Sequence, residues 1–205
     1  MPMTWLNFAF RGAMRLAAMA VPDIGILLLS FALWIAPRAV GVERLEEFLL
    51  LFAFEFVAVH AAGVLSLILK PESTALGLPR WMMLFGYLAG VGALVAVIAV
   101  LRNEVWPFFA FWGVTGNRLA AWYRAPDVAT RREGMQSWVA SPAFYLVSAL
   151  LTSFMPVPAL GISAEVVADA GLVARSGLWA AKPERGLACA ILYYGLQAWW
   201  RRRQS

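Results

Sequence analysis

Residues 80–102 read RWMMLFGYLAGVGALVAVIAVLR, and this stretch decides the class of fold. No charged residue lies between Arg80 and Arg102. At about 1.5 Å per residue, an α-helix of this length spans the roughly 30 Å hydrocarbon core of a bilayer. The stretch therefore predicts a transmembrane helix over 81–101 that ends at an arginine on each side.

The composition of the whole chain agrees with a membrane location. Of its 205 residues, 62% are hydrophobic and 14% are charged, compared with roughly 45–50% and 25% in soluble domains. The 17 basic and 12 acidic side chains are too few to cover the surface of a soluble domain of this size. We therefore expect lipid to surround most of the chain.

Apolar stretches bounded by charge or proline recur along the chain and predict a single membrane domain, 1–205, that is an all-α polytopic bundle. Residues 1–19 contain aromatic side chains beside Arg11 and Arg15 and are expected to form an amphipathic segment in the headgroup region. The sixth stretch has only 15 residues, so five spans are an alternative to six. The expected spans are 21–37, 48–69, 81–101, 105–123, 137–155 and 186–200.

The distribution of Lys and Arg predicts the orientation of this bundle, because the richer side faces the cytoplasm. With six spans, one side holds both termini and 11 basic residues, and the other holds six. Both termini are therefore expected to be cytoplasmic. The first set comprises Arg11, Arg15, Lys70, Arg80, Arg118, Arg124, Arg131, Arg132 and Arg201 to Arg203; the second comprises Arg38, Arg44, Arg102, Arg175, Lys182 and Arg185.

Several classes of function find no support in the sequence. The basic residues lie at the ends of apolar stretches and not on one face, so the net charge of +5 does not indicate nucleic-acid binding. The single cysteine, Cys189, excludes an internal disulfide and a multi-cysteine metal site. Glu46-Glu47 and Phe56-x-x-x-His60 superficially resemble elements of CAAX-type intramembrane proteases, but they share one predicted helix and a second histidine is missing. We expect no catalytic residues, no metal centre and no enzyme.

Two ionisable residues lie within the second predicted span. Glu55 is placed deep in the apolar stretch, and His60 is the only histidine of the chain. Ionisable groups inside a membrane are candidates for functional sites. A separation of five residues puts these two about 140° apart around a straight helix, so they are expected to face different neighbours. The alternatives are a proton or ion relay, a haem or chlorophyll-type ring ligated by His60, and two neutral groups hydrogen-bonded to adjacent helices.

The span 81–101 also contains a stripe of small residues. Gly86 and Gly90 are four residues apart, and Gly92 follows them. Small residues allow two helix backbones to approach closely inside a membrane. We expect a helix-packing interface at these three glycines.

Two polar residues, Asn117 and Arg118, lie about one and a half turns before the end of the span 105–123. An arginine at this depth extends its side chain to the lipid headgroups. The alternative is that Arg118 pairs with Glu55 inside the bundle or with a lipid phosphate. Together with Glu55 and His60, these residues are the candidate intramembrane polar site.

The segment Leu49-Leu-Leu-Phe-Ala-Phe-Glu55-Phe-Val-Ala-Val-His60 resembles the glutamate-bearing second helix of a family of small bacterial multi-pass membrane proteins that is known only as a domain of unknown function. The resemblance covers this one helix. It implies a multi-pass protein of a bacterial cytoplasmic (inner) membrane. It implies no activity, since the family has none assigned.

Many packing features and no complete catalytic motif favour a non-catalytic helical subunit of a larger membrane complex. Its expected partners are membrane lipids and other membrane-protein subunits. The sequence requires no cofactor, and His60 is the candidate ligand if a haem or chlorophyll-type ring is bound. The alternative function is a small proton- or ion-coupled transporter or channel that uses Glu55 and His60, although no inverted repeat is visible.

Overall fold

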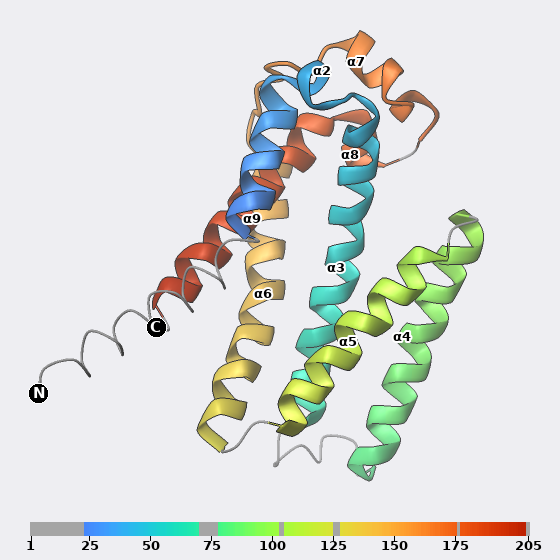
Figure 1. The fold of residues 1–205 in the computed structure, drawn as a ribbon, viewed down its shortest axis with the longest axis vertical. Helices are drawn as coiled ribbons and strands as arrows, with labels where there is room; N and C mark the ends of the chain where they lie inside the picture. The colour runs from blue at the N-terminus through green and yellow to red at the C-terminus, as the bar shows by residue number, and fades with distance from the viewer. Residues whose placement is uncertain (1–22, 70–77, 103–104, 125–127, 176, 204–205) are drawn as a thin grey trace, which may run out of the picture. The chain divides into compact units, whose positions relative to one another are not determined.

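The helices of this protein begin and end near the charges and prolines that interrupt its apolar stretches. A computed structural model describes residues 23–69, 78–102, 105–124, 128–175 and 177–203 (Figure 1). Across these residues every regular element is helical, so the fold is all-α. The predicted amphipathic segment 1–19 lies outside the described residues. The long elements are a helix over Asp23–Ile35, α3 (Glu43–Leu69), α4 (Arg80–Arg102), α5 (Trp106–Arg124), α6 (Val128–Phe154) and α9 (Pro183–Arg203).

Charged residues extend several helices beyond the apolar stretches that the sequence marks. The first turn of α3 contains Glu43 and Glu46, and the last turn of α9 contains Arg201 to Arg203. Acidic groups at a helix N-terminus and basic groups at a C-terminus are stabilised by the helix dipole. Pro183 occupies the first position of α9, where its missing N–H leaves no hydrogen bond unmade.

Two helices, Glu43–Leu69 and Arg80–Val100, are long and apolar enough to cross a membrane. Asp23–Ile35 and Trp138–Phe154 are shorter apolar helices. Only 17% of the apolar stretch of α4 is buried, compared with 44% of that of α3. A helix that is this apolar and this exposed requires either lipid or another protein around it.

Four short helices complete the part of the chain that the structure describes. They are α2 (Pro37–Val40), α7 (Ala164–Asp169), the 3-10 helix η1 (Leu172–Ala174) and α8 (Leu178–Ala181). Ser163 caps α7, since its hydroxyl oxygen accepts a hydrogen bond of 3.3 Å from the backbone N–H of Val166. Three of the four lie in the long connection between α6 and α9, and all four lie at one end of the unit described next (Figure 1).

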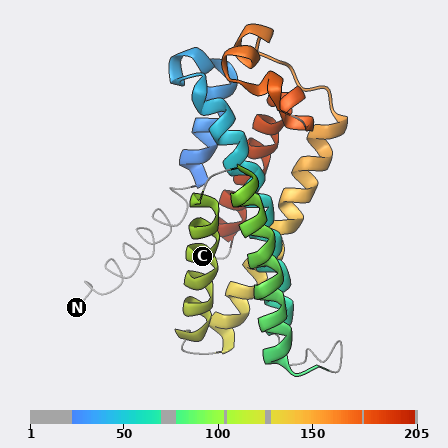
Figure 2. The ribbon, with the colours of Figure 1, turned by 90° about the vertical axis from the view of Figure 1, so that its right-hand side faces the viewer.

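The described residues form two units, each with its own packed interior. Unit 1 contains residues up to Phe52 and from Phe144 onward, and unit 2 contains Ala53–Ala143. In unit 2, α4 and α5 run side by side (Figure 2), with Ala61, Val95 and Phe111 at the centre of the core. The buried residues of unit 1 are contributed by the helix Asp23–Ile35, the beginning of α3, the end of α6, the connection between α6 and α9, and α9.

Candidate functional site

The connection between α6 and α9 forms a cap at one end of unit 1. The cap comprises residues 155–182, and its contacts reach parts of the chain more than 120 residues away. The Trp34 indole N–H donates to the carbonyl of Pro158 at 2.9 Å, and the Gly161 N–H donates to the carbonyl of Trp34 at 3.0 Å. These two bonds join the end of the first helix to the start of the cap.

Ion pairs join the remainder of the cap to the same end of unit 1. Arg38 lies 3.4 Å from Glu165 and 3.2 Å from Asp169, and Arg175 lies 2.6 Å from Glu46. The Arg185 guanidinium donates to the carbonyl of Ser153 at 2.5 Å, which satisfies an acceptor in the last turn of α6. Each exposed pair contributes little on its own, but together these contacts attach the cap to α2 and α3 and the start of α9 to the end of α6.

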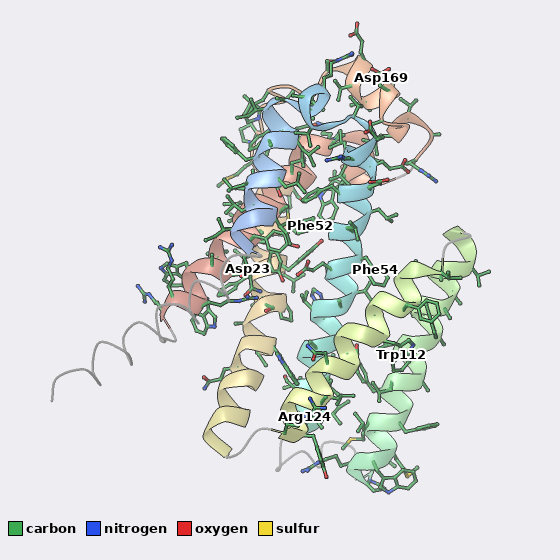
Figure 3. All side chains as sticks on the ribbon, in the orientation of Figure 1. Asp23, Phe52, Phe54, Trp112, Arg124 and Asp169 are labelled. Atoms are coloured by element: carbon green, nitrogen blue, oxygen red, sulfur yellow. The ribbon has the colours of Figure 1, made fainter. Side chains whose placement is uncertain are left out.

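At the other end of unit 1, a buried carboxylate pairs with the last turn of α9. Asp23 Oδ2 lies 3.1 Å from Arg201 Nη1, and the exposed fractions of the two side chains are 8% and 38%. A carboxylate this far from water requires a charged partner. Asp23 lies well away from Asp169 of the cap (Figure 3). The pair brings the start of the first helix to the end of the last.

Aromatic rings fill the interior of unit 1, with Phe52 of α3 at their centre (Figure 3). The Tyr145 hydroxyl donates to the Phe52 carbonyl at 3.0 Å, so α6 is hydrogen-bonded to α3 at this level. The ring centroids around Phe52 are those of Tyr145 at 4.9 Å, Trp179 at 5.2 Å, and Tyr193 and Tyr194 both at 6.0 Å. This cluster, called the Phe52 cluster below, is a packing feature with no reactive group.

Small polar groups are also buried in unit 1. Thr152 donates to the Ser148 carbonyl at 2.9 Å and forms a side-chain hydrogen bond with Cys189. The Gln197 amide donates to the Tyr193 hydroxyl at 3.2 Å. Such interhelical and intrahelical bonds satisfy polar groups that lipid cannot satisfy. Among the described residues, no three His, Cys, Asp or Glu side chains are placed to hold a metal ion.

Glu55 and His60, the two ionisable residues within the apolar stretch of α3, are half-buried in unit 2. His60 Nδ1 lies 2.7 Å from the Phe56 carbonyl, and its ring centroid lies 4.0 Å from that of Phe56. Since a carbonyl only accepts, Nδ1 is the donor in this hydrogen bond. Next to His60 along α3, the Ala61 carbonyl accepts a hydrogen bond from the Tyr87 hydroxyl, which joins α4 to α3.

The three glycines of α4 lie in two different environments. A Cβ atom on Gly92 would lie 2.6 Å from the Trp112 ring, so this glycine allows α5 to pack closely against α4. A Cβ atom on Gly86 or Gly90 would meet no atom of the described residues within 4 Å. The reason is geometric, since residues 90 and 92 are about 200° apart around the helix. Gly86 and Gly90 thus belong to an exposed face.

The polar pair on α5 is described only in part. Asn117 is exposed, and Arg118 lies in α5 with its side chain outside the described part of the chain. Glu55 and His60 both lie on α3, as the sequence predicts. The pairing of Arg118 with Glu55 stays a prediction, because the Arg118 side chain lies outside the described residues. The structure also reveals the Asp23–Arg201 pair, which the sequence analysis missed. The signal was present, because Asp23 is the only charged residue between Arg15 and Arg38.

Comparison of the chain with protein families, with curated proteins and with solved structures found no match.

Proposed function

We propose that the chain is a non-catalytic helical subunit of a larger complex in a bacterial cytoplasmic membrane, with about six spans and both termini in the cytoplasm. The observation that carries the proposal is the exposed small-residue face of α4. Ala89 and Ala93 are exposed beside Gly86 and Gly90, and together these four residues are called the glycine face below. Leucine or phenylalanine at such positions would fill space toward lipid, whereas glycine leaves room for another helix backbone to approach closely.

The contacts within unit 1 support the six-span topology. If successive spans alternate in direction, the end of the first, the start of the second, the end of the fifth and the start of the sixth lie on one side of the membrane. The cap contacts two of these ends through Trp34 and Glu46, and the hydrogen bond of Arg185 to Ser153 joins the other two. The pairing of Asp23 with Arg201 agrees with an even number of spans, because it brings the start of the first helix to the end of the last.

The role of the glycine face can be tested by measuring which partner subunits co-purify with the chain in mild detergent. Gly86→Ile/Gly90→Ile should leave the chain folded, because both positions are open, but should strongly reduce the yield of the partner subunits that accompany the wild-type chain. Gly25→Ile is the matched control, since Gly25 is also an exposed helical glycine, and a Cβ atom placed on it would meet no described atom within 4 Å. The measurement is quantitative mass spectrometry of the proteins that co-purify with each variant.

Two outcomes of that experiment would contradict the proposal. A wild-type chain that always purifies without other proteins is not a subunit. Partners that are retained by Gly86→Ile/Gly90→Ile bind at another surface. Gly92→Ala provides a comparison for misfolding, because its Cβ would collide with Trp112 and disturb the packing of α4 on α5.

Two ionisable side chains within the apolar stretch of α3 favour one alternative, a small proton-coupled transporter or channel. Glu55 and His60 are both half-buried, and Glu55 lies five residues earlier on the same helix. This alternative predicts proton flux in proteoliposomes loaded with a pH-sensitive dye, and a loss of about tenfold or more in Glu55→Gln. Glu47→Gln, at an exposed position of α3, is the control. Wild-type vesicles without flux, or equal flux in the two variants, would exclude a relay through Glu55.

A further inference from the structure

Three consecutive arginines, Arg201 to Arg203, end α9 after 15 uncharged residues, and their environments differ. Arg201 is neutralised by Asp23 at 3.1 Å. Arg202 and Arg203 are exposed, and the Arg203 guanidinium lies 4.3 Å from the centre of the Trp199 ring. Trp199 itself is 46% exposed. The Arg203 guanidinium and the Trp199 indole therefore share one surface at the end of an apolar helix, and Arg202 is exposed beside Arg203 in the sequence.

This end of unit 1 carries an excess of positive charge. The helix Asp23–Ile35 contains one acidic residue, and residues 136–154 and 186–203 contain none. That single carboxylate is the partner of Arg201, and three arginines end α9, so the net charge of these segments is positive. Such a surface attracts anions.

We propose that Trp199, Arg202 and Arg203 form a binding surface for the headgroups of anionic phospholipids in the cytoplasmic leaflet. This inference rests on the proposed function, since it requires α9 to end at the inner membrane surface. Guanidinium groups bind phosphate oxygens in pairs, and an exposed indole is favoured at the boundary between headgroups and acyl chains. Leu192, which is 40% exposed and precedes Trp199 by about two turns on the same side of α9, would then lie along an acyl chain of the same lipid.

The net positive charge determines which lipid is preferred. A zwitterionic headgroup has its own cation, which competes with the arginines for the phosphate. A phosphatidylglycerol headgroup has none, so its net negative charge complements both Arg202 and Arg203. A soluble anion such as inorganic phosphate matches the arginines but gains nothing from the apolar surface of α9.

The test is native mass spectrometry of the purified full chain with equal amounts of phosphatidylglycerol and phosphatidylcholine in mild detergent. The wild-type chain should bind phosphatidylglycerol more tightly. Arg202→Gln/Arg203→Gln should reduce the ratio of the two binding constants roughly tenfold. Arg44→Gln/Lys182→Gln removes two exposed basic residues at the cap end of unit 1 and should leave the ratio unchanged.

Several other outcomes of this experiment would overturn the proposed lipid-binding surface. An unchanged ratio in Arg202→Gln/Arg203→Gln, or an equal loss in the control, overturns the proposed surface. Full competition by inorganic phosphate does the same, because it indicates a site for a soluble anion. If the double variant does not fold, the wild-type preference must decrease at high salt, and a preference that salt does not alter overturns the proposal.

Alkaline carbonate extraction of native membranes separates the two proposals. Release of the chain into the soluble fraction contradicts the proposed membrane function. A chain that stays in the membrane fraction and shows no preference for phosphatidylglycerol contradicts the lipid surface and leaves the subunit function intact.

Discussion

Gly161→Ala is expected to lower the free energy of unfolding by about 2 to 3 kcal/mol, the cost of overpacking a rigid site. A Cβ atom at this position would lie 2.7 Å from the carbonyl carbon of Ile35, still closer to its oxygen, and 2.8 Å from Cδ of Pro37. These are backbone and ring atoms, which cannot rotate away. The Gly161 N–H also donates to Trp34, so a shift of the loop breaks a bond that attaches the cap.

The measurement is the apparent Tm of purified variants in the same detergent. Gly25→Ala is the control, because it adds the same methyl group in open space within a helix and should be neutral or slightly stabilising. Equal Tm values for wild type and Gly161→Ala would show that the contact between the cap and the first helix is not rigid.

Phe52→Ala is the second substitution with a large expected effect, about 3 kcal/mol of lost stability. The Phe52 side chain is 2% exposed and packs against five other aromatic rings, those of the four residues named above and that of Phe48, whose centroid lies 6.3 Å away. In a membrane the loss does not come from exposure to water, since lipid is as apolar as the ring. It comes from the cavity that alanine leaves and from the dispersion contacts that the neighbouring rings lose.

Two further variants separate the contribution of the buried ring from that of its hydrogen bond to this loss of stability. Phe154→Ala removes a ring that is 81% exposed and should change the Tm little. Tyr145→Phe keeps the ring in the Phe52 cluster and removes only its hydrogen bond to the Phe52 carbonyl, with an expected cost of about 1 kcal/mol. If Phe52→Ala were no worse than Phe154→Ala, the cluster would not be the packed core of unit 1.

The sequence predicts the helices of this protein well because apolar stretches and charges are local signals. It is less informative about helix ends. The apolar stretch begins at Phe48, whereas α3 begins at Glu43, where acidic groups favour a helix N-terminus. In the same way, α6 begins at Val128, although its apolar stretch starts near 137. Hydropathy indicates whether a segment is surrounded by water or by apolar groups. It does not indicate at which residues the backbone hydrogen bonds of a helix begin and end.

Pairings between distant residues were beyond the sequence analysis. Nothing local to Arg38 or Glu46 indicates that each pairs with the cap, because the partners follow more than 120 residues later. The division of the α4 glycines was accessible, since the helical period already puts Gly92 on a different side from Gly86 and Gly90. Which of the two sides meets α5 depends on Trp112, and only the folded chain shows that contact.

The contacts of the cap also constrain how the protein is made. Trp34, Arg38 and Glu46 meet partners that are 124, 127 and 129 residues further along the chain. The residue that Trp34 of the helix Asp23–Ile35 contacts is therefore synthesised 124 residues after it. Until then this helix lacks its contact with the cap, so in the proposed membrane subunit factors that shield newly inserted helices would act on it for longer than on later ones.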